Sequence, residues 1–413
     1  MKIALLTMGT RGDVQPFAVL GKALQQRGHE VTLATAKNFA SMAASYGLTF
    51  IPVDADFQEI LNSPEGKKMM SNPFSARKHL DRLIYPMIYN SLKTFYHVAK
   101  ENDRILFHVK AMADYFGEEM HGKLIRANVV PAIEPTKEFV NPVFSTFHLP
   151  AFMNRLTYKL SDLGIKMMGK PVNKFRQEAG INTKYKKPQL PSLYGISPMF
   201  LPQPKDYPAN AHFTGFWTEA SSEALPNDVT DFINAGSPPL LITFGSMPFE
   251  SNMNLSEVLN SLTTALNTRL MVIKGWGLTD TVQLEQNSNI KVIESAPYDK
   301  LMPHVKAVMQ HGGIGTIAAC IKAGKPFMVC PVLYPLGDQH FWGAVAHKKG
   351  IALKPVALKK MQKDIFINAA KELLTKEALY INSEQLMEQI KNEDGVANAI
   401  ELIENKYQQP YKA

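Results

Sequence analysis

A segment near position 310 has the residue types that bind a phosphate group. The segment HGGIGT, residues 311–316, follows a short apolar run and precedes residues of helical composition, so it predicts a turn between a strand and a helix. Free backbone N–H groups and the positive end of the helix dipole meet at such a turn, which favours an anion. Because glycine lacks a Cβ, a phosphate can approach this backbone closely.

Three further polar side chains occupy positions where they could act on a sugar or a hydroxyl group. Asp338 and Gln339 lie in the loop after the next predicted strand, and their oxygen and nitrogen atoms suit sugar hydroxyls. Asp13 lies in the segment GTRGDVQP, residues 9–16, at the turn after the first apolar strand. Its carboxylate could accept a proton from a reacting hydroxyl, or it could simply cap the helix that follows.

The elements around these residues predict an α/β fold built from parallel sheets. Residues 2–7 and 29–35 are apolar and strand-like, and residues 14–27 between them have the apolar spacing of a helix. A strand, a helix and a strand in this order form a right-handed unit of a parallel sheet. The same pattern returns with a strand at 239–244 and a glycine turn at Gly245-Ser246.

The length of 413 residues predicts two domains, and a proline-rich segment indicates where they meet. Residues 197–208 contain four prolines, which disfavour a helix and a central strand. We predict a first domain over residues 1–198, a linker over 199–212, a second domain over 213–390 and a C-terminal helical segment over 391–413.

Composition narrows the class of protein. Apolar residues make up 45% of the chain and charged residues 20%, as in globular soluble proteins, and no window reaches the ~20 apolar residues of a membrane helix. The N-terminus does not resemble a signal peptide, so we expect a cytoplasmic protein. Cys320 and Cys330 lie in apolar runs, which favours buried thiols over a disulfide. We interpret the triplet Asp54-Ala55-Asp56 as the polar end of a strand rather than a metal site.

The net charge of +8 is compatible with a diphosphate substrate, an anionic membrane surface or a nucleic acid. No nucleic-acid-binding motif is present, so a nucleic acid is not expected. The basic residues cluster only within residues 155–187. We interpret this cluster as a solvated helical face, and the alternative is a helix that contacts a membrane surface.

Three linked motifs give the sequence a family resemblance. HGGIGT, followed by AGKP at 323–326 and GDQHFWG at 337–343, resembles the donor-site signature of the family-one glycosyltransferases with the GT-B fold. The branch it resembles most contains the sterol glucosyltransferases and the glycosyltransferases of glycopeptide and macrolide antibiotics, whose N-terminal GSRGDVxP is similar to GTRGDVQP. The resemblance implies two Rossmann-like domains whose parallel sheets face each other across a cleft, with the last helix crossing back onto the first domain.

The resemblance also implies a role for each candidate residue. Asp13 would be the base that deprotonates the acceptor hydroxyl. Because position 13 is not a histidine, as it is in plant relatives, a His–Asp dyad is not expected. The donor would lie between the domains without a metal ion, its diphosphate bound by Ser246, His311, Gly313, Gly315 and Thr316 and its sugar by Asp338 and Gln339.

Two positions depart from the plant-type pattern. The tryptophan that stacks on uracil is missing from SAPY at 295–298, which leaves Trp276, Ala296 and Tyr298 as candidates for nucleobase contact. The glutamate that binds the ribose is replaced by Ala319. The choice between UDP and dTDP therefore stays open.

We predict an inverting, metal-independent glycosyltransferase that needs no cofactor. It would transfer a hexose, with UDP-glucose as the leading donor, to a hydroxyl of a lipophilic molecule such as a sterol, polyphenol or macrolide, and would act as a monomer or a weak dimer. The variable segment 61–100 would help to build the acceptor pocket. The alternatives are a dTDP-deoxysugar transferase such as a rhamnosyltransferase, a lipid-linked transferase at a membrane surface, and an inactive nucleotide-sugar-binding subunit. The intact Asp13 argues against the last of these.

Overall fold

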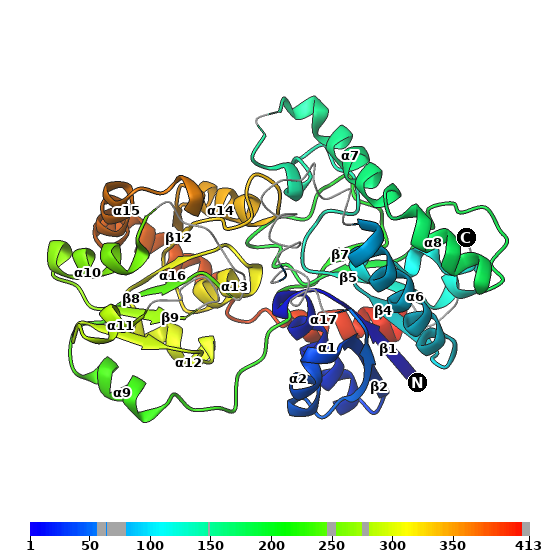
Figure 1. Cartoon of the computed structure of the whole chain (residues 1–413), viewed down its shortest axis with the longest axis horizontal. Helices are drawn as coiled ribbons and strands as arrows, with labels where there is room; N and C mark the ends of the chain where they lie inside the picture. The colour runs from blue at the N-terminus through cyan, green and yellow to red at the C-terminus, as the bar shows by residue number, and fades with distance from the viewer. Residues whose placement is uncertain (56–62, 64–79, 148, 246–252, 275–280, 407–413) are drawn as a thin grey trace.

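Two parallel β-sheets form the centres of two domains in the computed structural model (Figure 1). The structure describes residues 1–55, 63, 80–147, 149–245, 253–274 and 281–406. The first sheet has seven strands in the order β3 (Thr49–Val53), β2 (Glu30–Ala36), β1 (Lys2–Leu6), β4 (Arg104–Phe107), β5 (Leu124–Asn128), β6 (Ser192–Tyr194) and β7 (Ala211–Phe213).

Helices cover both faces of the first sheet, so its strands are apolar on both sides. In β1, Ile3 and Leu5 face one layer of helices, whereas Ala4 and Leu6 face the other, and all four are fully buried. The first layer contains α1 (Arg11–Gln26) and α2 (Ala40–Ser45), and the second contains α6 (Tyr85–Lys100) and α8 (Gly169–Glu178). A further helix of this domain is α7 (Asn154–Lys166).

The second sheet repeats this plan with six strands. Their order is β10 (Ile290–Ile293), β9 (Leu270–Ile273), β8 (Leu240–Thr243), β11 (Ala307–Gln310), β12 (Phe327–Val329) and β13 (Ala352–Leu353). One face packs against α10 (Leu255–Leu266), α11 (Val282–Glu285) and α15 (Lys363–Thr375). The other packs against α12 (Tyr298–Leu301), α13 (Ile314–Lys322), α14 (Gln339–Lys348) and α16 (Glu377–Ile390). The helix α9 (Asn227–Asn234) precedes the sheet.

The strand order reverses at an equivalent point in each sheet. The first strand in chain order, β1 or β8, lies beside the fourth, β4 or β11. In open α/β sheets, ligands bind beyond the carboxyl ends of the strands at this point. The prediction of two Rossmann-like domains with the GT-B fold is confirmed. The residues that follow these four strands are therefore the candidates for a ligand-binding site.

The first domain extends further along the chain than the sequence indicated. Strand β7 pairs in parallel with β6, so the predicted linker 199–212 contributes the edge strand of the first sheet. The predicted boundary at residue 198 is therefore wrong. The chain leaves the first domain after Phe213, through a segment in which Trp217 is 3% exposed.

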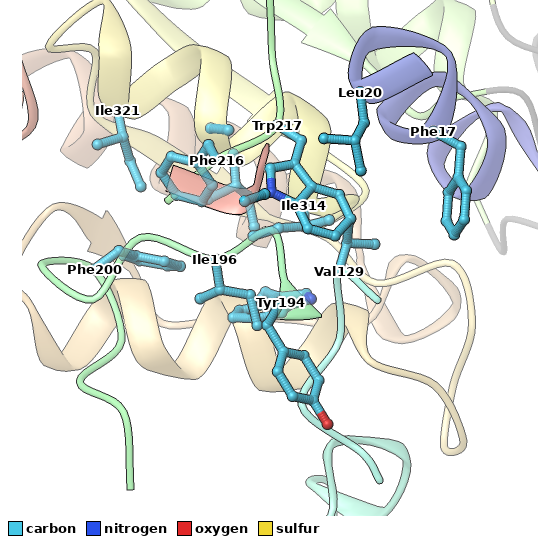
Figure 2. Close-up of a cluster of buried hydrophobic side chains, with 14 of the residues drawn as sticks. Phe17, Leu20, Val129, Tyr194, Ile196, Phe200, Phe216, Trp217, Ile314 and Ile321 are labelled. Atoms are coloured by element: carbon cyan, nitrogen blue, oxygen red, sulfur yellow. The ribbon is translucent and has the colours of Figure 1, made fainter. Parts of the chain in front are cut away.

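Trp217 takes part in a buried cluster with side chains from both domains (Figure 2). Its ring meets that of Phe17 edge-on, with 6.5 Å between centroids, and its indole N–H donates to Thr214 Oγ1 at 2.9 Å. Ile314 and Ile321 of α13 belong to the same cluster. This apolar contact ties the connecting segment to both domains.

The C-terminal segment returns to the first domain. Helix α17 (Gly395–Glu401) packs against α1, and Glu404 accepts hydrogen bonds from Arg27 and contacts His29 at 2.9 Å. Gly395 and Gly215 approach so closely that a Cβ on Gly395 would lie 2.3 Å from the Gly215 carbonyl carbon. Glycine is required at this crossing because a larger residue would separate the two segments.

The segment 61–100 is only partly described, because residues 61–62 and 64–79 lie outside the described residues. Its second half forms α6, whose Leu92 and Phe95 are fully buried in the core, so this half is part of the sheet domain rather than an insertion. Cys320 and Cys330 are buried free thiols, as predicted. Within the described residues, no helix combines the length and the apolar composition needed to cross a membrane.

Candidate active site

The first half of the site forms where β1 and β4 end side by side. Leu6 of β1 is in register with Phe107 of β4. Asp13 lies in the first turn of α1, which follows β1, and His108 directly follows β4. The sheet therefore brings together two residues that are far apart in the sequence.

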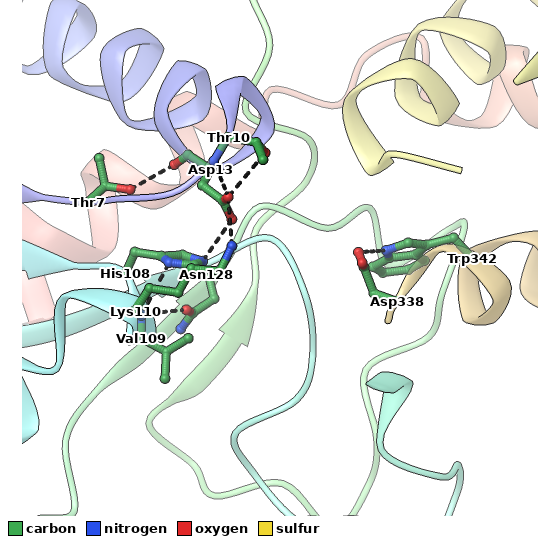
Figure 3. Close-up of polar contacts among 9 residues, drawn as sticks. All are labelled: Thr7, Thr10, Asp13, His108, Val109, Lys110, Asn128, Asp338 and Trp342. Atoms are coloured by element: carbon green, nitrogen blue, oxygen red, sulfur yellow. Dashed lines mark hydrogen bonds and ion pairs between the residues drawn. The ribbon is translucent and has the colours of Figure 1, made fainter. Parts of the chain in front are cut away.

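The Asp13 carboxylate is held by three residues, Thr10, Lys110 and His108 (Figure 3). Its Oδ2 accepts hydrogen bonds from the Thr10 backbone N–H at 2.8 Å and from Lys110 Nζ at 2.7 Å. Its Oδ1 lies 3.5 Å from His108 Nε2. Asp13 thus helps to cap α1, but Oδ1 keeps capacity to accept another proton.

The proximity of His108 corrects the expectation that no His–Asp pair would form. The histidine is supplied by the end of β4 rather than by position 13. Neither His108 nor Lys110 was identified from the sequence. The available signal was a histidine at the end of a predicted strand, and it becomes informative only once β4 is known to lie beside β1.

Burial and neighbouring charges shift the pKa values of Asp13 and His108 in opposite directions. Burial raises the pKa of Asp13, but the Lys110 and His108 charges and the hydrogen bonds from Lys110 and Thr10 outweigh it and leave the pKa below its ordinary value. Burial lowers the pKa of His108 to about 4, although the Asp13 charge opposes this effect. At neutral pH the pair is therefore a carboxylate beside a neutral imidazole.

Backbone contacts assign the tautomer of His108. Its Nδ1 accepts the Lys110 backbone N–H at 3.3 Å, so the proton of the neutral ring belongs on Nε2, which faces Asp13. The turn itself is fixed by Asn128, whose Oδ1 accepts the Val109 N–H at 3.1 Å. Because His108 is only 3% exposed, it can orient Asp13 but has little access to a substrate.

The second half of the site forms at the equivalent turn of the other domain. His311 follows β11, Gly312 has a φ of 101°, and Gly313 is the N-terminal cap residue of α13. Among the described residues no side chain caps this helix, so its first N–H groups stay available to a ligand. A Cβ on Gly315 would meet no atom of the described residues within 4 Å.

The His311 ring is enclosed by two glycines. A Cβ added to Gly245 would lie 2.7 Å from the ring, and a Cβ added to Gly313 would lie 2.5 Å from it. Burial lowers the pKa of His311 to about 4, against a smaller opposite effect of the Thr243 backbone. Its Nδ1 is buried and has no hydrogen-bond partner among the described residues.

Two other residues that were predicted to contact the donor, Tyr298 and Thr316, contact each other at the start of α13. The Tyr298 hydroxyl lies 3.0 Å from Thr243 Oγ1 and also interacts with the Thr316 side chain. Thr316 is 7% exposed, and Ala296 and Tyr298 pack against the main core cluster. The predicted contacts of Ser246 and Trp276 lie outside the described residues.

The two predicted sugar-binding residues differ in which of their polar atoms are already used in hydrogen bonds within the protein. Asp338 precedes α14, and its Oδ2 accepts the indole N–H of Trp342 at 3.0 Å instead of capping the helix. Gln339 uses its Oε1 to accept the Val332 and Leu333 N–H groups at 2.8 and 2.9 Å. Only its Nε2 remains for a ligand. Trp342 is fully buried.

The two halves of the site are electrostatically linked. Burial raises the pKa of Asp338, and among the smaller effects the Lys110 charge lowers it and the Asp13 charge raises it. Figure 3 shows Asp338 on the opposite side from Asp13 and Lys110. Contacts between the domains fix the loop before Asp338: Val143 O accepts the Gly337 N–H at 3.2 Å, and Thr146 Oγ1 donates to Pro335 O at 2.7 Å.

A metal site is not formed by the described residues, in which no three His, Cys, Asp or Glu side chains gather in a suitable arrangement. Of the triplet at 54–56, Asp54 lies 3.8 Å from Lys37 and Asp56 is outside the described residues. Within the described residues, the groups beside the α13 turn that face a diphosphate are the backbone N–H groups of its first turn and the His311 ring.

Comparison with known proteins places the chain among glycosyltransferases. The family model for the glycosyltransferase family 28 N-terminal domain matches residues 3–102, and the model for UDP-glucoronosyl and UDP-glucosyl transferase matches residues 109–394. The chain is 30% identical to a sterol 3-beta-glucosyltransferase of Arabidopsis thaliana, with 98% of this chain and 68% of the relative covered.

Two further similarities come from bacterial natural-product enzymes. The chain is 29% identical to the O-mycaminosyltylonolide 6-deoxyallosyltransferase of Streptomyces fradiae, with 98% and 97% of the two chains covered. The crystal structure of the glycotransferase of kitacinnamycin matches with a TM-score of 0.73 over 99% of both chains, at 18% identity. At this identity the structural match supports the fold alone.

Proposed function

This chain belongs to the UDP-glucoronosyl and UDP-glucosyl transferase family, and we propose that it transfers a hexose from a nucleotide diphosphate sugar to a hydroxyl of a lipophilic small molecule. The observation that carries the proposal is that each domain presents suitable groups at a strand end. One presents a carboxylate with a buried histidine partner, and the other presents an uncapped helix start beside an imidazole.

In the proposed reaction, Asp13 Oδ1 accepts the proton of the acceptor hydroxyl. Oδ1 is suited to this step because Oδ2 already accepts hydrogen bonds from Thr10 and Lys110. The acceptor oxygen forms a bond to the anomeric carbon while the bond from that carbon to the diphosphate oxygen breaks. A single displacement of this kind inverts the anomeric configuration.

The leaving diphosphate carries the electron pair of the broken bond, and the second domain supplies donors for it. The first N–H groups of α13 are preorganised for this charge, and the His311 ring lies beside them. These groups support our proposal that no metal ion or other cofactor takes part. Gly313 and Gly315 would let the phosphates approach the backbone.

His108 has a positioning role in this scheme. Its Nε2–H faces Asp13, while Nδ1 is already occupied by a backbone N–H. A neutral imidazole in this tautomer orients the carboxylate and cannot itself take the acceptor proton through Nε2. The base is therefore Asp13, and the histidine is its partner, with Lys110 as the second charged neighbour.

We propose UDP-glucose as the donor and a sterol-like, polyphenolic or macrolide-like acceptor. The named activity of the plant relative supports glucose and a sterol, and the named activity of the Streptomyces relative supports a macrolide acceptor. The same Streptomyces name favours a deoxysugar donor, which keeps a dTDP-deoxysugar transferase as the second candidate. The free thiols support the cytoplasm as the proposed compartment.

The experiment that tests the proposal is a screen of donors against acceptors, read by mass spectrometry, with EDTA in a parallel series. We expect a hexosylated product from UDP-glucose in both series. Turnover only with dTDP-deoxysugars would select the second candidate, and turnover abolished by EDTA would contradict the metal-free mechanism. Tight UDP binding without any product would indicate an inactive binding subunit.

A further inference from the structure

The surface of the first domain carries a concentration of exposed apolar side chains on and beside α7. Fourteen large hydrophobic residues are exposed in the described structure, and seven of them fall within residues 147–167. Phe152 is the extreme case, with 85% of its surface exposed. Scattered exposed apolar residues are normal in proteins, but half of them in one short segment indicates an interaction surface.

The exposed apolar residues of this segment form one stripe. Leu156, Leu160, Leu163 and Met167 are 46–59% exposed, and their spacing places them within an arc of about 60° on a helix. The opposite face of α7 is the buried one, through Asn154, Thr157 and Tyr158. The helix therefore packs on the domain with one face and presents leucines to solvent with the other.

Basic residues border this stripe on one side. Arg155, Lys159 and Lys166 are all exposed and project within about 40° of one another on α7, next to the leucines. Asp162 is the sole acidic residue between positions 150 and 175, and Lys187 binds it at 3.2 Å. Lys159 and Lys166 have no carboxylate within salt-bridge distance among the described residues.

We propose that α7, with Phe152 before it, docks on an anionic phospholipid surface and lies in the plane of the membrane. The stripe of leucines would enter the interface between headgroups and acyl chains, and the bordering lysines would meet lipid phosphates. Charge complementarity selects this partner, because a neutral apolar partner would leave the lysines unused. Figure 1 places α7 on the outside of the first domain, where a flat surface can reach it.

This inference goes beyond the proposed function. A lipophilic acceptor concentrates in a bilayer, so docking would bring the first domain to its source. The test nevertheless uses no donor and no acceptor, so its result does not depend on the assigned reaction.

The test is co-sedimentation of the full chain with vesicles of phosphatidylcholine alone or mixed with phosphatidylglycerol. We expect binding to the mixed vesicles that weakens as salt is raised. The variant Lys159→Gln/Lys166→Gln should bind about 30-fold more weakly, because each lysine near an anionic surface contributes about a fivefold factor. The variant Leu156→Ser/Leu163→Ser should lose at least about tenfold on the same vesicles.

Matched controls carry the same substitutions on exposed residues of the second domain. Val282→Ser/Ile381→Ser and Lys348→Gln/Lys371→Gln should bind mixed vesicles as the native chain does, since these residues are exposed but lie far along the chain from α7. Thermal unfolding of every variant verifies that it is folded.

Three results would overturn the proposal. The first is failure of the native chain to bind anionic vesicles, and the second is equal loss in the α7 variants and their controls. The third is concentration-dependent self-association, measured by sedimentation velocity, that disappears in Leu156→Ser/Leu163→Ser while vesicle binding persists. That result would make the stripe a contact between two copies of the chain.

Discussion

Asp13 is the residue whose substitution separates catalysis from donor binding. Asp13→Asn keeps the shape and the capping ability of the side chain but removes the base, so we expect kcat to fall by about 10²–10⁴-fold. UDP affinity, measured by calorimetry, should change little because the proposed diphosphate contacts lie in the other domain. The matched control is Asp364→Asn, which removes another acidic residue from the first turn of a helix. Full turnover in Asp13→Asn would remove the assigned base.

The charge of Lys110 should be visible in the pH dependence of the reaction. The Lys110 cation helps to hold the pKa of Asp13 below its ordinary value, so Asp13 stays ionised, and active, to a lower pH. Lys110→Met removes this effect and should shift the acidic limb of the kcat/KM profile to higher pH. Lys37→Met, whose lysine lies near the exposed Asp54, serves as the control. An unmoved acidic limb would contradict the Asp13–Lys110 contact in solution.

At the scale of single residues, the sequence predicts which side chains have suitable chemistry better than it predicts which of their atoms are free to bind a ligand. Asp13 and His311 were identifiable because each lies in a motif at a strand end. His108 was not, since its role depends on which strand lies beside β1. Gln339 has the predicted type, yet its oxygen is used by the backbone of its own loop. Such contacts between side chain and loop are set by tertiary structure.

At the scale of elements, the turn after β8 supports the turn before α13 that we propose to bind phosphate. Gly245 has a φ of 74°, and a Cβ there would lie 2.7 Å from the His311 ring. Gly245→Ala should therefore displace His311 and weaken UDP binding by about tenfold or more, since a hydrogen bond to a charged group is worth about 1.5–3 kcal/mol.

The control for this substitution is Gly47→Ala, where φ is 67° and a Cβ would meet no atom of the described part of the chain within 4 Å. Both variants should lose about 1–2 kcal/mol of unfolding free energy from backbone strain. Calorimetric titration with UDP then distinguishes them. Equal UDP affinities would show that the His311 ring does not depend on Gly245.

Strand, turn and helix periodicity was sufficient to predict most elements near the site, but it failed at the edge of the first sheet. Strand β7 has three residues and follows the proline-rich segment 197–208, which reads as a linker. An edge strand tolerates neighbouring prolines because one of its sides has no hydrogen-bonding partner. Proline content therefore could not distinguish a linker from the outermost strand.

At the scale of the whole molecule, Glu404 connects the C-terminal segment to α1. The hydrogen bonds from Arg27 and His29 hold the pKa of Glu404 below its ordinary value. A carboxyl with a depressed pKa stabilises the fold above its unfolded-state pKa, and this stabilisation is lost as the pH falls through the folded-state pKa.

Glu404→Gln should therefore lower the unfolding free energy by about 1 kcal/mol or less near neutral pH, and by less in acid. Thermal unfolding at several pH values measures this difference. Glu388→Gln breaks only a contact with the nearby Lys391 and is the control. A difference that stays constant from neutral to strongly acidic pH would exclude the carboxylate as its origin.

The two-domain architecture was predictable because each half of the chain shows the same strand–helix alternation and a glycine turn at its opening. The placement of the candidate site followed from this repetition, since parallel sheets bind ligands where their strand order reverses. The contacts between domains, such as Thr146 with Pro335, have no counterpart in local sequence patterns.

The packing of α17 on α1 has a consequence for how the protein is made. The last strand of the first sheet ends at Phe213, yet α17 is about 190 residues further on. At about 5–20 residues per second, a ribosome needs about 10–40 s to cover that distance. The partners of Ala399 and Ile400 on the first domain stay uncovered for this interval, so the part synthesised first is the part completed last.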